Sequence, residues 1–275
     1  MDVNLLGFGL GAVVGLILAL AGAGGGILAV PLLVFGLHLS IMQAAPVGLI
    51  AVGAASAFGA ILGLREGLVR YRAAALIGIT GMVLAPLGVR LAGLIPNQPL
   101  MVVFSIVLAW VAWRMFNQAR RGKGAHAKLG HAQSRLPCFL DPREGRLIWT
   151  MPCAWALAGT GAVSGILSGL LGVGGGFVIV PSLSRYTNIP MRSVFATSLA
   201  VIALVSVGGV TAAAWQGAVA WAIALPFALG AIVALLAGRL IAARLAGAHL
   251  QQGFAVTSGA VAMLLLARGL GWIEG

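Results

Sequence analysis

The sequence predicts an all-α, polytopic membrane protein built from two repeats of opposite orientation. The first observation is the composition: 61% of the 275 residues are hydrophobic, 8% are charged, and the mean hydropathy is +1.08. Soluble domains carry about 25% charged residues, so this composition indicates helices that face lipid. The second observation is a glycine-rich stretch that occurs twice, 150 residues apart.

Ten apolar segments follow one another, five in each half of the chain. Those of the first half are 3–21, 25–37, 44–64, 73–95 and 100–115. Those of the second half are 148–171, 174–183, 194–215, 219–243 and 254–267. The first, third and fourth segments of each half are long enough to cross a hydrocarbon core of about 30 Å, and the fifth is borderline. The short second segment either crosses at a tilt or forms a re-entrant hairpin with the first, which gives about eight to ten spans.

The two halves also share single residues at the same offset. Ser56 aligns with Ser206, Gly59 with Gly209, Gly67 with Gly217 and Phe104 with Phe254. Such self-similarity indicates one duplicated unit. We therefore divide the chain into a first transmembrane repeat (1–116), a basic cytoplasmic linker (117–147) and a second transmembrane repeat (148–275).

The distribution of basic residues predicts the orientation of these segments. Between Arg114 and Arg146 the chain has eight lysines and arginines against Asp141 and Glu144, and the positive-inside rule places such a stretch in the cytoplasm. An odd number of crossings in each half then leaves both termini outside and the two repeats inverted, which is the plan of many secondary transporters. A hairpin of the first two segments would keep the same parity.

Several classes of function are disfavoured by what the predicted spans lack. All five acidic residues, Asp2, Glu66, Asp141, Glu144 and Glu274, lie outside them, which argues against a proton relay and against acid–base catalysis. We therefore expect no enzyme and no cofactor. The spacing of Cys138 and Cys153, the two cysteines of the chain, is unlike that of a metal site or a C-x-x-C redox motif. The net charge of +12 belongs to loops beside the lipid bilayer, so we expect no nucleic-acid partner.

The duplicated glycine-rich stretch is the main candidate for a binding site. It contains Gly24, Gly25 and Gly26 in the first half and Gly174, Gly175 and Gly176 in the second. Each glycine lowers helix stability by about 0.5–1 kcal/mol relative to alanine, and freed backbone groups survive in a membrane only inside protein or beside water. We expect each triplet to break a helix, and short helices beginning near Gly26 and Gly176 to offer free N–H groups to an anion. Close helix packing is the alternative.

Neutral hydroxyl groups complete the predicted site. Ser56 and Ser206 occupy equivalent positions, and Thr197 and Ser198 lie nearby in the second half, although each hydroxyl could instead bond to its own helix. Substrate binding is thus assigned to Gly24, Gly25, Gly26, Ser56, Gly174, Gly175, Gly176, Thr197, Ser198 and Ser206. A negative cell interior drives an anion outward by about 2.3 kcal/mol per charge per 100 mV, so an anion exporter needs no coupling carboxylate.

The motif resembles that of the TauE/SafE family of sulfite exporters. The matching residues are Gly22-x-Gly24-Gly25-Gly26-x4-Pro31 and Gly172-x-Gly174-Gly175-Gly176-x4-Pro181, and the resemblance covers the chain outside 120–146. It implies a multi-pass transporter of the inner membrane that exports sulfite or organosulfonates, with binding at both glycine triplets, Thr197 and Ser198. The first-half counterpart of Ala196-Thr197-Ser198-Leu199 contains Pro46 and Val47, so it lacks both hydroxyls.

Other functions stay open at this point. The chain could be an anion channel, a transporter of another small carboxylate or oxyanion, or a membrane-embedded assembly partner. A homo-oligomer is also compatible with the sequence.

Overall fold

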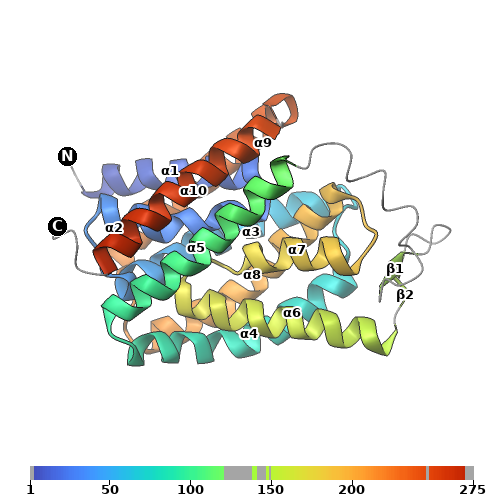
Figure 1. Ribbon diagram of the computed structural model, residues 1–275, viewed down its shortest axis with the longest axis horizontal. Helices are drawn as coiled ribbons and strands as arrows, with labels where there is room; N and C mark the ends of the chain where they lie inside the picture. Colours follow the sequence, from blue (N-terminus) through green and yellow to red (C-terminus); the bar gives the residue numbers. More distant parts are fainter. Residues whose placement is uncertain (1–2, 121–137, 141–146, 149, 246–247, 270–275) are drawn as a thin grey trace.

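The computed structural model describes residues 3–120, 138–140, 147–148, 150–245 and 248–269, which form a helical bundle (Figure 1). The helices of the first half are α1 (Val3–Ala21), the 3-10 helix η1 (Gly22–Leu28), α2 (Ala29–Gly36), α3 (Ile41–Arg65), α4 (Tyr71–Leu94) and α5 (Asn97–Arg120). Those of the second half are α6 (Met151–Leu171), α7 (Gly176–Tyr186), α8 (Met191–Trp215), α9 (Trp221–Leu245) and α10 (Ala248–Gly269). Between the halves, β1 (Phe139–Leu140) pairs antiparallel with β2 (Leu147–Ile148).

The helices agree with the predicted apolar segments, and they differ mainly where polar residues extend them. Helix α3 begins at Ile41 because Ser40 and Gln43 form a capping box, in which each side chain accepts the backbone N–H of the other at 3.3 Å. The Oδ1 of Asn97 also accepts the N–H of Ile41 at 3.1 Å, which joins the starts of α3 and α5. Helix α5 continues to Arg120 and so enters the predicted linker.

The outer surface of the bundle is apolar, as a membrane protein requires. Among the described residues, five helices are long and apolar enough to span a bilayer: α3, α4, α6, α8 and the Trp221–Arg239 part of α9. Large hydrophobic side chains face outward along them, including Val83, Val207 and Leu229. In a soluble protein such a surface would aggregate, so the chain is a multi-pass membrane protein.

Helices of one half pack mainly on helices of the other half. Helix α1 packs along α9, and α6 along α4, while α3 and α8 cross at the centre and α5 lies beside α10 (Figure 1). In Figure 1, α1 starts at the side marked N and α6 starts at the opposite side, beside β2. The inverted orientation of the two repeats stays a prediction, with which these opposite directions agree.

Single contacts recur at the offset of the repeat. A Cβ built on Gly59 would lie 2.9 Å from Cδ1 of Leu199, and a Cβ built on Gly209 would lie 3.1 Å from Cδ1 of Leu49. The two contacts are equivalent under the 150-residue offset of the repeat, because Gly59 corresponds to Gly209 and Leu49 corresponds to Leu199. In the same way, Gly15 lies against the backbone of Ala231, and Gly165 lies against the backbone of Gly81. Such close approach requires residues without a side chain.

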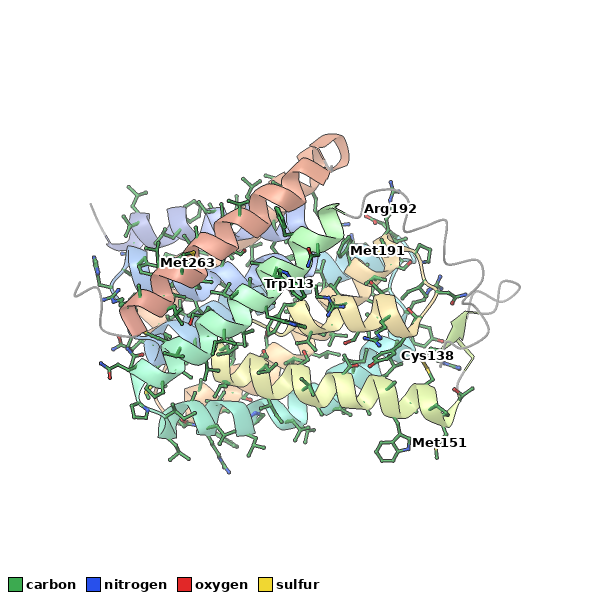
Figure 2. The ribbon with its side chains drawn as sticks, in the orientation of Figure 1. Trp113, Cys138, Met151, Met191, Arg192 and Met263 are labelled. Atoms are coloured by element: carbon green, nitrogen blue, oxygen red, sulfur yellow. A yellow bond between two sulfur atoms is a disulfide. The ribbon has the colours of Figure 1, made fainter. Side chains whose placement is uncertain are left out.

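Most charged residues of the described chain gather at one end of the bundle, whereas Arg268 lies over the Phe35 ring at the other end. At the charged end the Arg70 N–H donates to Oγ1 of Thr197 at 3.0 Å, and Arg239 pairs with Glu66 at 3.2 Å. Figure 2 shows Arg192 and Cys138 there as well, and Met263 toward the opposite end. The turns of the opposite end, 37–40, 95–96 and 216–220, contain no lysine, arginine or acidic residue. The positive-inside rule predicts that the charged end, which includes Cys138, is cytoplasmic.

Candidate functional site

The second glycine triplet breaks the helix at the predicted place. Helix α6 ends at Leu171, and α7 begins at Gly176. Between them Gly172, Gly174 and Gly175 have φ values of 73°, 78° and 72°. This left-handed conformation costs a residue with a Cβ about 1–2 kcal/mol, so these three positions depend on glycine.

The first triplet has a different conformation, which corrects the prediction of two equal breaks. Residues Gly22–Leu28 form the 3-10 helix η1, and α2 begins at Ala29 rather than near Gly26. Two sequence differences explain this. Ala23 favours helix more than its counterpart Val173 does, and Val14 stands where Ser164 in the second half donates its hydroxyl to the Gly175 carbonyl oxygen at 3.3 Å. The free N–H groups are therefore found at the second interruption.

The two interruptions meet in the interior of the bundle. A Cβ built on Gly26 would lie 2.9 Å from Cγ1 of Val52 and 3.1 Å from the carbonyl oxygen of Val173. A Cβ built on Gly174 would lie 3.2 Å from the same Cγ1 atom. All six glycines of the triplets are buried, and among Gly24, Gly25, Gly26, Gly174 and Gly175 it is Gly24 that has open space around the position of a Cβ. The predicted convergence is thus present, and it is tightly packed at most positions.

The hydroxyls of two serines lie at the neighbouring crossing of α3 and α8. A Cβ built on Gly53 would lie 2.9 Å from Oγ of Ser206, and one built on Gly174 would lie 3.8 Å from it. Ser206 is 3% exposed, and Ser56, one turn from Gly53, is fully buried. Neither hydroxyl has a hydrogen-bond partner among the described residues. Because an unpaired buried hydroxyl costs about 1–3 kcal/mol, its presence indicates a place for water or a ligand.

An open cavity of about 300 Å³ lies beside Ser206, between α3 and α8, and it opens on the outer surface of the bundle, where Val207 in its wall is 53% exposed. Its walls are mainly aliphatic, and none of the described residues that line it is charged. The lining residues are Leu49, Ile50, Gly53, Ala54, Ala57, Ala203, Ser206, Val207, Val210 and Thr211. This volume is at the lower end of the range for small-molecule sites, so the cavity is large enough for a small anion.

The start of α7 approaches the cavity only through Gly174, which lies near Ser206, because none of the triplet glycines is in the cavity wall. The first N–H groups of a helix have no partner within the helix, and no side chain caps α7. These groups and the helix dipole together favour a bound anion. Gly174, which precedes α7, is the residue of this break that lies near the unpaired hydroxyl of Ser206. Neutral donors from two elements thus come together without a buried cation.

Two further serines belong to this region and were not predicted from the sequence. Ser164 binds the Gly175 carbonyl oxygen, as noted above, and Ser168 is fully buried with an Oγ that has no partner in the described part of the chain. Their first-half counterparts are Val14 and Leu18. The signal available in the sequence was this pair of serines before the second triplet, because the first copy has apolar residues at both positions.

The structure separates Thr197 from the glycine triplets. Its Oγ1 accepts the Arg70 N–H, so it fastens the turn between α3 and α4. Thr197 lies nine residues from Ser206, which corresponds to about 13 Å along a helix. Ser198 is fully buried and also lacks a partner for its hydroxyl within the described ranges. It lies on the same side of α8 as Ser206, two turns closer to the charged end.

The sequence model of a known family covers nearly the whole chain. This family is described as sulfite exporter TauE/SafE, and its model matches residues 7–265. The chain belongs to the TauE/SafE family. The family assignment and the apolar helices identify a membrane transporter.

Relatives of this TauE/SafE protein include a "Probable membrane transporter protein" of Xylella fastidiosa strain Temecula1, 30% identical over 269 residues, which are 94% of each chain. A protein with the same description from strain 9a5c is 29% identical over 267 residues, again 94% of each chain. A probable membrane transporter protein of Methanocaldococcus jannaschii is 29% identical over 72% of this chain and 68% of its own. No solved structure matches the chain.

Proposed function

We propose that this TauE/SafE transporter exports small sulfur-containing oxyanions, sulfite or organosulfonates, across the cytoplasmic membrane. The observation that carries the proposal is the uncapped start of α7 beside the buried, unpaired hydroxyl of Ser206. A helix start binds an anion through several N–H groups at once. The aliphatic walls of the cavity suit the organic part of a sulfonate.

The proposed binding set is Gly24, Gly25, Gly26, Ser56, Gly174, Gly175, Gly176, Thr197, Ser198 and Ser206. Within it, the N–H groups at Gly175 and Gly176 and the hydroxyls of Ser206 and Ser56 hold the anion. The first triplet closes the site against Val173. Ser198 and Thr197 follow on α8 toward the charged end, where the Thr197 hydroxyl accepts the Arg70 N–H.

The direction of transport follows from the charge of the cargo. None of the described residues that line the cavity is acidic or basic, so a bound anion keeps its charge within the membrane. A negative interior then drives it outward by about 2.3 kcal/mol per charge at 100 mV. Weak binding by neutral groups also allows release. Alternating access of the two repeats around the α3–α8 crossing completes the proposed mechanism.

The test is efflux of radiolabelled sulfite from proteoliposomes that contain the purified protein, with and without an imposed potential. We expect efflux that rises when the interior is made negative and falls when an organosulfonate competes. Acetate as a competitor tests whether a carboxylate is accepted instead. Efflux no faster than from protein-free liposomes would overturn the proposal, and single-channel conductance in planar bilayers would replace the carrier by a channel.

A further inference from the structure

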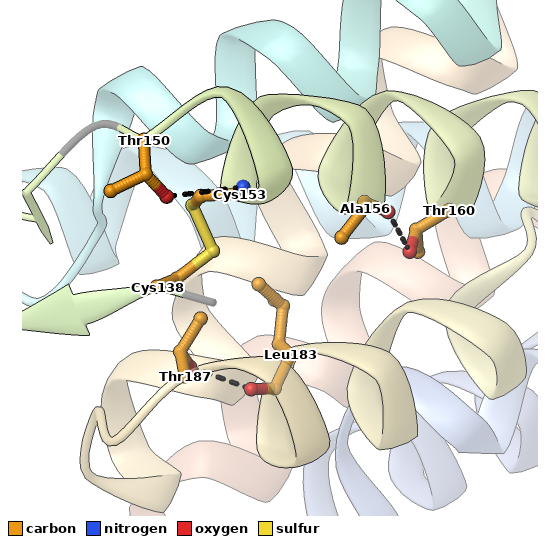
Figure 3. The surroundings of a disulfide bond; sticks show 7 residues. All are labelled: Cys138, Thr150, Cys153, Ala156, Thr160, Leu183 and Thr187. Atoms are coloured by element: carbon orange, nitrogen blue, oxygen red, sulfur yellow. Dashed lines mark hydrogen bonds between the residues drawn. A yellow bond between two sulfur atoms is a disulfide. The ribbon is translucent and has the colours of Figure 1, made fainter. Parts of the chain in front are cut away.

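A disulfide joins the linker to the first turn of α6. It connects Cys138 to Cys153, whose Cα atoms are 5.0 Å apart (Figure 3). The Cys153 N–H donates to Oγ1 of Thr150, which caps α6. Both cysteines are buried, with 0% and 1% of their surfaces exposed. The sequence analysis did not predict this pairing.

Cys138 is also bound to the far end of α7. Its N–H donates to the carbonyl oxygen of Tyr186 at 3.3 Å, and it forms a parallel β-bridge with Thr187. The hydroxyl of Thr187 donates to the Leu183 carbonyl oxygen at 2.6 Å, in the last turn of α7 (Figure 3). One residue of the linker therefore ties the start of α6 to the end of α7.

Helix α7 is joined to α6 at its other end by a glycine-rich connection that is packed in the bundle interior. Gly172, Gly174 and Gly175, all with positive φ, separate it from α6. Glycine has more accessible backbone conformations than any other residue. Helix α7 has eleven residues, and it packs on α6, α8 and η1 through the buried side chains of Phe177, Ile179 and Leu183. The Cys138 contacts add a backbone attachment at its far end.

The charged end of the bundle is an unusual place for a permanent disulfide. The positive-inside rule assigns this end, with Arg70, Arg185 and Arg192, to the cytoplasm. Cytoplasmic disulfides of most organisms are transient and redox-sensing, because small thiols reduce them. A disulfide in this position is expected to change state with the thiol pool once local opening uncovers its buried sulfurs.

We propose that Cys138 and Cys153 form a reversible redox latch, which fixes α7 when oxidised and releases it when reduced, so that transport is faster in the reduced state. The transport readout rests on the proposed function, because α7 carries the proposed anion site at its start. The latch itself rests on the contacts of Cys138.

The reductant is a low-molecular-weight thiol. Its thiolate attacks one cysteine sulfur, the sulfur–sulfur bond breaks, and the other cysteine leaves as a thiolate that takes up a proton. A second thiol attacks the mixed disulfide, frees the remaining cysteine and leaves the two small thiols joined as a disulfide. Two electrons pass to the protein, which ends as a dithiol.

The test compares oxidised and reduced protein in the same proteoliposomes. The chain has two cysteines, so a reductant acts on this pair alone. We expect dithiothreitol to raise sulfite efflux by about fivefold, the low end of a coupling between two sites. The variants Cys138→Ser and Cys153→Ser should show the fast rate with or without reductant. Intact mass at the end of each assay verifies the redox state, since sulfite also cleaves disulfides. Equal rates for the oxidised and reduced wild type would overturn the latch.

A second measurement does not depend on transport. Amide hydrogen exchange of α7 should increase about tenfold on reduction, while exchange of α3 stays unchanged. Unchanged exchange in α7 would overturn the latch, whether or not sulfite is carried. Efflux absent from every sample, with faster α7 exchange on reduction, would overturn the proposed function and retain the latch.

A third measurement tests the compartment in intact cells. A membrane-impermeant maleimide, added after the outer membrane has been opened and a reductant applied, should leave both cysteines unlabelled. A permeant maleimide should label them in growing cells without added reductant. Labelling by the impermeant reagent would place the two cysteines on the external, oxidising side of the membrane and overturn the latch.

Discussion

Replacing Ser206 with alanine separates binding from stability. The hydroxyl is buried and has no partner in the described part of the protein, so its removal relieves a cost of about 1–3 kcal/mol. We expect the free energy of unfolding to stay the same or rise by about 1 kcal/mol. A hydrogen bond to a charged ligand contributes about 1.5–3 kcal/mol. Because 1.36 kcal/mol corresponds to a factor of ten, we expect the loss of this bond to raise the KM for sulfite about 10- to 150-fold.

The assay measures KM from the concentration dependence of sulfite efflux, and stability from thermal unfolding in detergent. Ser258→Ala is the matched control, because Ser258 on α10 is equally buried and unpaired among the described residues but does not line the cavity. It should change stability in the same direction and leave KM unaltered. A wild-type KM for the Ser206 variant would refute the reasoning. So would a loss of more than about 2 kcal/mol of stability, because the hydroxyl would then have a structural partner.

The remaining predictions concern packing, backbone and charge. Gly165→Ala places a Cβ against the carbonyl oxygen of Gly81 and should lower the melting temperature in detergent through a loss of about 1–3 kcal/mol; Gly159→Ala on the same helix meets no atom within 4 Å and should be neutral or stabilising. Gly174→Ala should cost about 1–2 kcal/mol through its φ of 78° and slow efflux, whereas Gly24→Ala, with open space around it, should insert and unfold like the wild type. Glu66→Gln breaks an ion pair whose side chains are 52% and 29% exposed, so unfolding at low and high salt should differ from the wild type by less than about 1 kcal/mol. Opposite rank orders within either glycine pair, or a larger salt-sensitive loss for Glu66→Gln, would contradict these expectations.

Much of the fold could be predicted because apolar runs of membrane length leave few alternatives. The predicted segment 3–21 coincides with α1, and Gly176 begins α7 as expected. The conformation of the first triplet could not be predicted from its three glycines, because the same three residues remain helical when the surrounding residues favour helix. That difference depends on the hydrogen bond from Ser164 to Gly175. The sequence does not show this bond, because a hydroxyl in a helix often bonds to its own backbone, as that of Thr160 does with Ala156.

The disulfide and the place of Thr197 could not be predicted for a related reason. Both depend on how segments far apart in the chain come together at one end of the bundle. The Thr197 hydroxyl accepts the N–H of Arg70, 127 residues away. Cys138 pairs with Cys153, and the sequence between them has no apolar periodicity. In such cases the local sequence pattern identifies the secondary structure of a segment, but it does not identify the distant residues that the segment contacts.

The pairing of α1 with α9 has a consequence for biosynthesis. Helix α1 leaves the ribosome before the other described helices, and its partner α9 ends at Leu245, more than 220 residues later. At about 5–20 residues per second, the newborn helix waits roughly 10–40 s with Gly11 and Gly15 facing lipid or the insertion machinery. Burial of the α1 surface therefore waits for the late arrival of α9, and any factor that shields small-residue faces during translation would act on α1.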